Sequence, residues 1–115
     1  MYALTISLRA QNQSGATIIR QASLDVIKPS LQESDCLFFD VLFDDTDPLL
    51  IRFYEAYTNR SAFQTHLEAP HTKAWAQVCM PHVEKSSICM PESESDHGLS
   101  QYSRSAMTPN NSIKI

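Results

Sequence analysis

Glycine is scarce in this chain of 115 residues, which holds only Gly15 and Gly98. A phosphate cradle made of backbone amides needs several closely spaced glycines, because only glycine lets the backbone approach the anion closely. The sequence contains neither a dinucleotide fingerprint nor a phosphate loop. We therefore expect no nucleotide cofactor.

Paired cysteines and long apolar runs are also missing. Cys36, Cys79 and Cys89 are odd in number and show no CxxC spacing, which indicates a reducing compartment rather than a disulfide framework. No segment reaches the ~20 consecutive apolar residues of a membrane span. The N-terminus alternates and soon carries Arg9, unlike a secretory signal. We expect a cytoplasmic protein without a membrane partner.

Basic residues are few and scattered. The chain has nine Lys and Arg residues and 13 Asp and Glu residues, which gives a net charge of -4, and no run of basic residues occurs. Binding to phosphate backbones needs a clustered basic face. Nucleic acid is therefore excluded as an expected partner.

What the sequence does contain is clear apolar periodicity. It predicts strands over residues 2–10, 37–43, 49–57 and 83–90, and helices over about residues 16–28, 60–68 and 71–80. Ser14 is the expected cap of the first helix, Pro29 should end or kink that helix, and Pro70 should interrupt the second.

The order strand, helix, strand, strand, helix, strand predicts an α+β fold, the ferredoxin-like split βαβ with an antiparallel sheet. We assign this domain to residues 1–90. Residues 91–115 are rich in Ser and poor in large apolar side chains, so we expect a polar tail that is flexible or docks on a partner subunit.

Both faces of the predicted sheet carry apolar side chains. Phe38 and Leu42 alternate with the inward residues of the second strand, and Leu50 and Tyr54 do so in the third. Helices of this fold cover only one face of the sheet. A second copy of the chain can cover the other face, so we expect a homodimer.

Two histidines are the sharpest candidates for chemistry, because imidazole exchanges protons near neutral pH. His66 lies on the same helical stripe as Phe63 and Leu67, so it should point toward apolar surroundings. His71 shares a helix face with Trp75, four residues on. The alternative is that both histidines are structural.

The spacing of the histidines argues against a metal site. His66 and His71 are five positions apart across a proline, which does not match the i, i+4 zinc spacing. Only distant carboxylates such as Glu55 or Asp40 could complete a ligand set. We expect no metal.

Glu55 stands in an otherwise aromatic strand, between Tyr54 and Tyr57. A carboxylate in such a place must be paired, hydrogen-bonded or shifted in pKa, because burying a lone charge is costly. Glu55 could orient a histidine or act as a base. The structural alternative is a salt bridge to Arg52 or Arg9.

Aromatic side chains could wall a cavity for a flat substrate, or could simply form the core. The candidates for the substrate pocket are Phe39, Tyr54, Tyr57, Phe63 and Trp75.

Taken together, these residues resemble the antibiotic biosynthesis monooxygenase domain over roughly residues 3–90. The resemblance is carried by Phe53-Tyr-Glu-Ala-Tyr57, Ala62-Phe63, His66, Pro70-His71 and Trp75. The chain departs from the family in reading Glu33-Ser-Asp35 where Glu-Pro-Gly is frequent, and in its long tail. The first strand also lacks the asparagine of haem-degrading relatives.

The resemblance implies a dimeric α/β barrel and a cofactor-independent monooxygenase acting on a phenolic or quinol-type small molecule. It implies His66 or His71 as the base, with Glu55 orienting it or sharing the proton. A second branch of the family implies an isomerase of a phosphorylated small dione, the type that degrades autoinducer-2. That reaction would need basic residues at the cavity mouth.

A third alternative is a binding dimer that kept the fold and lost catalysis. A cavity too small for an aromatic ring would favour this alternative or the isomerase. Oxygen uptake with a panel of hydroquinones separates the three.

Overall fold

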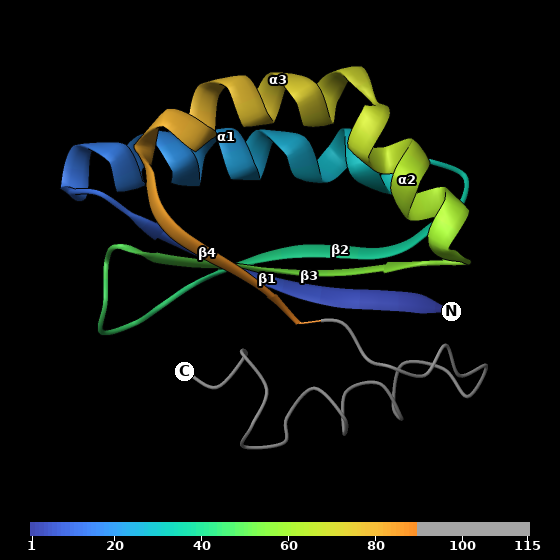
Figure 1. Cartoon of the computed structure of the whole chain (residues 1–115), viewed down its shortest axis with the longest axis horizontal. Coiled ribbons are helices and arrows are strands. Elements are labelled where there is room, and N and C mark those ends of the chain that lie inside the picture. The colour runs from blue at the N-terminus through green and yellow to red at the C-terminus, as the bar shows by residue number, and fades with distance from the viewer. Residues whose placement is uncertain (90–115) are drawn as a thin grey trace.

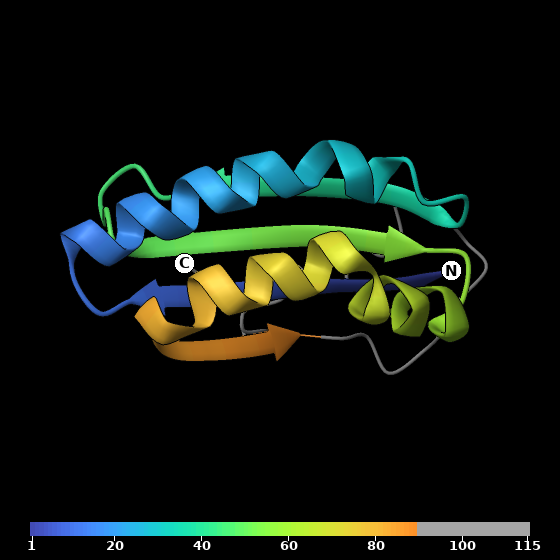
Figure 2. The same ribbon diagram turned by 90° about the horizontal axis from the view of Figure 1, so that it is seen from above.

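The computed structural model describes residues 1–89. Three helices lie on one face of a four-stranded antiparallel sheet (Figure 1). The elements are β1 (Tyr2–Ala10), α1 (Gln13–Leu31), β2 (Cys36–Phe43), β3 (Leu50–Tyr57), α2 (Arg60–Glu68), α3 (Pro70–Cys79), the 3-10 turn η1 (Met80–His82) and β4 (Val83–Cys89). The strand order β2-β3-β1-β4, visible from above in Figure 2, is the predicted ferredoxin-like α+β arrangement.

The predicted start and end of the first helix are wrong. Its cap is Asn12, whose side chain accepts the backbone N–H of Gly15 at 2.9 Å, whereas Ser14 only donates to the same Asn12 oxygen. The helix also passes through Pro29 and ends at Leu31. Proline leaves the carbonyl of Asp25 without its helical donor, and that residue is exposed, so water can supply the hydrogen bond.

The second strand is displaced at its start. A register shift lies between Cys36 and Phe38, and it turns Leu37 outward to 50% exposure. Cys36 packs against the core instead. Phe39 and Val41 are buried beneath the helices as predicted. The predicted fourth strand included Met90, which lies outside the described residues, as does the tail.

The core between the helices and the sheet forms two clusters. The larger one joins α1 and the sheet, with Leu8, Ile19, Ile51 and Phe53 among its buried members. The smaller one gathers around Tyr57 near the start of α2. The residues described below as the candidate site lie where the two clusters meet.

On the opposite face of the sheet, Phe38 and Leu42 are each 37% exposed. Tyr54 lies on this face too, because its cross-strand partners are Thr5 and Asp40. Among the described residues, no helix is long and apolar enough to cross a membrane.

Candidate active site

A break between two helices brings the two histidines together. His66 is in the last turn of α2, and His71 is in the first turn of α3. Between them Ala69 is extended (φ -65°, ψ 145°), and Pro70 begins the next helix. Proline suits that position because the first N–H of a helix has no intrahelical partner. The predicted interruption at Pro70 is therefore confirmed, and it turns the chain so that both imidazoles face one carboxylate.

That carboxylate belongs to Glu33, which follows α1. Its Oε2 lies 2.7 Å from Nδ1 of His66 and 2.6 Å from Nε2 of His71. A carboxylate only accepts hydrogen bonds, so each of these ring nitrogens carries the proton and donates it. The Glu33 connection and the β3–α2 connection lie side by side, where the backbone N–H of Thr58 donates to the carbonyl of Asp35 at 3.0 Å.

Glu33 was not predicted as a site residue. It stands in the stretch Glu33-Ser-Asp35, where this chain departs from the family pattern. The usable signal was topological, since a split βαβ unit places the α1–β2 and β3–α2 connections at the same edge of the sheet.

Glu55 extends the group into the core from β3, where it is buried. Tyr57 donates its hydroxyl to Glu55 Oε1 at 2.7 Å, and Nε2 of His66 lies 3.8 Å from that oxygen. Burial raises the pKa of Glu55 to about 7, and the negative charge of Glu33 adds to the effect, whereas the hydrogen bond from Tyr57 opposes it.

The alternative salt bridges to Glu55 are not formed. Arg52 pairs with Asp44, and Arg9 pairs with Asp47. Glu55 therefore has no cationic Lys or Arg partner in the ion pairs of residues 1–89, and it approaches neutral pH as a carboxylic acid.

His66 is the most enclosed histidine of the group, at 4% exposure. Aromatic rings surround it, with Phe39, Tyr57 and Phe63 centred 5.7, 5.3 and 6.3 Å from the imidazole. Burial lowers the pKa of His66, against the opposite effect of Glu33. The ring is therefore neutral at physiological pH, with its proton on Nδ1 and a free lone pair on Nε2.

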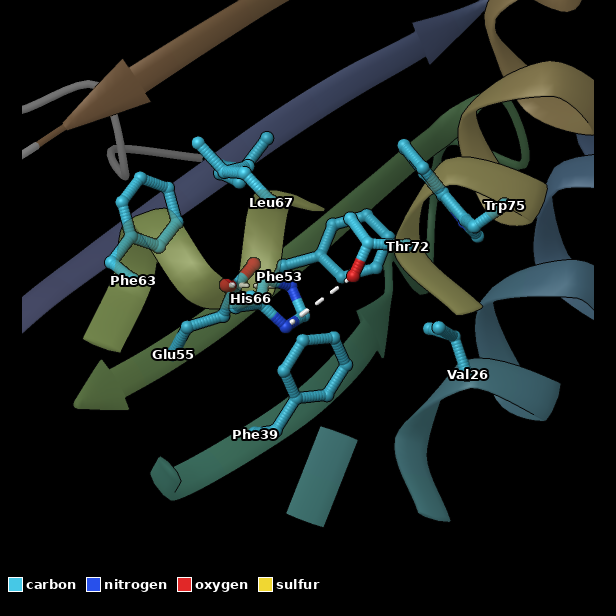
Figure 3. A pocket seen from close by; sticks show the side chains of 10 residues that line it. Val26, Phe39, Phe53, Glu55, Phe63, His66, Leu67, Thr72 and Trp75 are labelled. Atoms are coloured by element: carbon cyan, nitrogen blue, oxygen red, sulfur yellow. Dashed lines mark hydrogen bonds and ion pairs between the residues drawn. The ribbon is translucent and has the colours of Figure 1, made fainter. Parts of the chain in front are cut away.

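A cavity of about 80 Å³ lies beside His66 (Figure 3). Its walls are Ile6, Val26, Phe39, Phe53, Glu55, Phe63, His66, Leu67, Thr72 and Trp75. The indole of Trp75 is fixed there by a 3.0 Å hydrogen bond from Nε1 to Ser23 Oγ. Such a volume is smaller than the roughly 150 Å³ that encloses a benzene molecule in a well-studied engineered cavity.

A wider groove of about 290 Å³ adjoins the cavity between α1 and α3. It shares Val26 and Trp75 with the cavity and also contacts His71. Val26 and Trp75 therefore form part of the wall of both hollows.

The structure brings together most of the predicted site residues. His66, Glu55, Phe39, Phe63 and Trp75 line the cavity, and His71 joins through Glu33. Two of the predicted aromatic residues do not line it. Tyr57 lies behind Glu55 as its hydrogen-bond donor, and Tyr54 lies on the opposite face of the sheet.

The two histidines and Glu33 form a group of possible metal ligands that the spacing of the histidines does not indicate. Glu33, His66 and His71 each place one metal-ligating atom within 4.8 Å of the others. The sequence pointed only to distant carboxylates such as Glu55 or Asp40 as further ligands, whereas the third group here comes from a loop 33 residues before His66. Asp40, considered as a distant ligand, is exposed and instead accepts the N–H of Val41.

This is a ferredoxin-like α+β domain whose helix-covered face holds a buried carboxyl group, two histidines and an aromatic cavity. The family model for antibiotic biosynthesis monooxygenases matches residues 1–78, so the chain belongs to that family. No curated protein gives a significant match.

Solved structures agree on the fold. A Nitrosomonas europaea protein described as a candidate antibiotic biosynthesis monooxygenase superposes with a TM-score of 0.76 at 20% identity, covering 83% of this chain and 100% of its own. A Deinococcus radiodurans protein of the same description gives 0.73 at 23% identity, covering 86% and 98%. At these identities the likeness concerns the fold alone.

Proposed function

We propose that this protein is a cofactor-independent monooxygenase that oxidises a small phenolic or quinol-type molecule, with His66 as its base. The observation that supports this most strongly is the orientation of His66. Its Nδ1 proton is held by Glu33 at 2.7 Å, while Nε2 lies 3.8 Å from Oε1 of Glu55, and both His66 and Glu55 line the cavity.

Proton removal is the first step. The substrate hydroxyl donates its proton to Nε2 of His66, and Glu33 stabilises the imidazolium that forms. Phenylalanine rings at the cavity wall exclude water from the phenolate. Buried acid–base groups of this kind contribute about 10²–10⁴-fold to rate.

Oxygen addition follows from the electron-rich phenolate, which needs no outside reductant. A ring carbon forms a bond to O₂, and the resulting hydroperoxide loses water to leave a quinone oxygen on the ring. The substrate is oxidised, one oxygen atom stays in the product and the other leaves as water. Glu55, with a pKa of about 7, can supply a proton to the departing oxygen.

The cavity volume limits how such a substrate binds. At about 80 Å³ it does not enclose a whole ring, so the hydroxyl edge enters first and the rest of the molecule lies along Trp75 toward the groove. The larger groove then sets how far the substrate extends.

A small isomerase substrate is the second candidate, because the small cavity and the acid–base pair Glu55 and His66 suit the removal and return of a proton. Recognition of a phosphate group, however, calls for cationic side chains. None of the described residues that line the cavity or the groove is Lys or Arg, and Asp25 adds negative charge. The small cavity thus favours the isomerase or a binding dimer, whereas the lack of cationic side chains counts against a phosphorylated substrate, and on this second observation we keep the oxygenase as the leading proposal.

We also propose that the chain forms a homodimer through the sheet face opposite the helices. The exposed side chains of Phe38 and Leu42 support this. Sedimentation at micromolar concentration should give twice the monomer mass, and a monomeric mass would disprove it.

Oxygen uptake with a panel of hydroquinones tests the catalytic proposal. His66→Ala should lower turnover by about 10²-fold or more. The matched control is His82→Ala, because His82 lies beside Gly15 at the start of α1, whereas Glu33 follows the end of that helix. Absence of turnover in the wild type, or full turnover in His66→Ala, would refute the oxygenase mechanism.

A further inference from the structure

Three ligand-type side chains converge on one point from three separate segments. Glu33 follows α1, His66 ends α2 and His71 begins α3. Both ring nitrogens point at the same carboxylate oxygen, at 2.7 and 2.6 Å. We propose that these side chains form a binding site for a divalent transition-metal ion such as Zn²⁺, and that the bound ion switches off His66 as a base.

The charge of Glu33 favours a cation at this point. The side chain of Glu33 is only 16% exposed, and its ion-pair partners among residues 1–89 are the two imidazoles. Neither partner is a Lys or Arg, so no permanent positive charge faces Glu33 in these ion pairs. A carboxylate removed from water without a full countercharge is costly, and a divalent ion supplies that charge.

The kinds of ligand select the kind of metal. Two imidazoles and one carboxylate match catalytic zinc sites and other first-row transition-metal sites, whereas Ca²⁺ and Mg²⁺ prefer oxygen ligands throughout. Thr72 Oγ1 lies 3.5 Å from Nδ1 of His66, so its hydroxyl or a water molecule can take a fourth position.

The two separations that involve Glu33 need to change only a little. Tetrahedral Zn²⁺ with bonds of about 2.0–2.2 Å separates its ligand atoms by roughly 3.4 Å. The present separations of 2.6 and 2.7 Å must therefore widen by less than about 1 Å. His71 can provide this shift, because its side chain is 23% exposed and lies next to the break between the helices.

Metal binding changes what His66 presents to the cavity. When Nδ1 binds the ion, the single proton of the neutral ring moves to Nε2. Nε2, which lies 3.8 Å from Glu55, then donates a hydrogen bond and no longer accepts a proton. This second half of the inference rests on the proposed role of His66, whereas the binding site itself does not.

Calorimetric titration of the full chain with Zn²⁺ tests the site. Free thiols also bind zinc, and Cys36 lies close to Glu33 in the sequence, so the titrations use a Cys36→Ser background. We expect one ion per chain, and at least tenfold weaker binding in Glu33→Gln and in His71→Gln, while His82→Gln binds as the background protein does. Equal binding in all variants, or no binding in the Cys36→Ser protein, would overturn the site.

Thermal unfolding guards against a folding defect. Zn²⁺ should raise the midpoint of the background protein, because a ligand that binds only the folded state stabilises it. If Glu33→Gln does not fold, the more exposed His71→Gln carries the test. A folded His71→Gln protein whose midpoint rises as much as the background would contradict the assignment.

Oxygen uptake tests the switch separately. Zn²⁺ should inhibit the Cys36→Ser protein and EDTA should restore it, with the zinc concentration for half inhibition at least tenfold higher in His71→Gln. Zinc that binds without inhibiting, or metal that stimulates turnover, would overturn the switch. If no hydroquinone is oxidised at all, the proposed function fails, while the calorimetric result on the site still stands or falls by itself.

Discussion

Strand β3 buries two ionisable side chains three residues apart, Arg52 and Glu55. Arg52 forms an ion pair with a carboxylate, whereas Glu55 forms none with a Lys or Arg of residues 1–89. Arg52 is 4% exposed and donates to Asp44 Oδ1 at 3.1 Å. Hydrogen bonds from the backbone of Asp47 and from Arg52 lower the pKa of Asp44 to about 2. Glu55, also 4% exposed on the other face, has its pKa raised to about 7.

The difference shows that burial alone does not fix the state of a charged group. The guanidinium of Arg52 is paired with a carboxylate on the β2–β3 turn, that of Asp44. Glu55 has no such partner and titrates in the physiological range. A group of that kind contributes little to stability at neutral pH but is suited to proton exchange.

The largest expected effect comes from removing the charge at Glu55. The folded protein binds the proton more tightly than the unfolded one, so the wild type loses stability as the pH rises from 4.5 to about 7. Glu55→Gln should abolish that loss and be more stable at pH 8 by roughly 3 kcal/mol. Urea unfolding between pH 4 and pH 8 measures the difference.

The control for this prediction is Glu68→Gln, which removes an exposed carboxylate at the end of α2. The free energy of unfolding of Glu68→Gln should change with pH in the same way as that of the wild type. If the free energy of unfolding of Glu55→Gln also followed that of the wild type between pH 4 and pH 8, Glu55 would be ionised in the folded state. The proposed contrast with Arg52 would then be wrong.

A smaller effect is expected from breaking the ion pair between Arg52 and Asp44. Arg52→Met leaves Asp44 without its cation and should lower the unfolding midpoint by about 5 °C at pH 7. Because the pKa of Asp44 is lowered, the wild-type advantage should disappear as the pH falls from 3.8 to about 2. Scanning calorimetry measures this, with Lys85→Met on the exposed part of β4 as control. An advantage that persists below pH 2 would rule out the ion pair as its source.

A hydrogen bond between two uncharged groups shows what a cost that does not depend on pH looks like, for comparison with Glu55→Gln and Arg52→Met. Ser23→Ala removes the acceptor of the Trp75 N–H and should cost about 1–2 kcal/mol. Neither group titrates, so the cost should be the same at pH 5 and pH 8 in urea unfolding, and Ser61→Ala at the exposed start of α2 should cost less. A cost that changes with pH would mean that Trp75 couples to Glu55.

The fold followed from the sequence because period-two and helical patterns survive in each element. The ends of the helices could not be predicted in the same way. Whether Asn12 or Ser14 caps the first helix depends on local geometry that the apolar pattern does not contain. Tyr54 was assigned to the pocket although strict alternation already placed it opposite Glu55. Glu33 could not be found from local pattern, because its contacts span 33 and 38 residues.

The extended residue Ala69 has a consequence for how the histidine pair is encoded. In an unbroken helix, side chains five positions apart are turned about 140° away from each other. The break at Ala69 and Pro70 corrects that phase, so a spacing that looks wrong for cooperation becomes the right one. We therefore expect Pro70→Ala to disturb the histidine pair more through helical phase than through any lost contact. Sequence searches for such pairs should treat an interrupting proline as part of the motif.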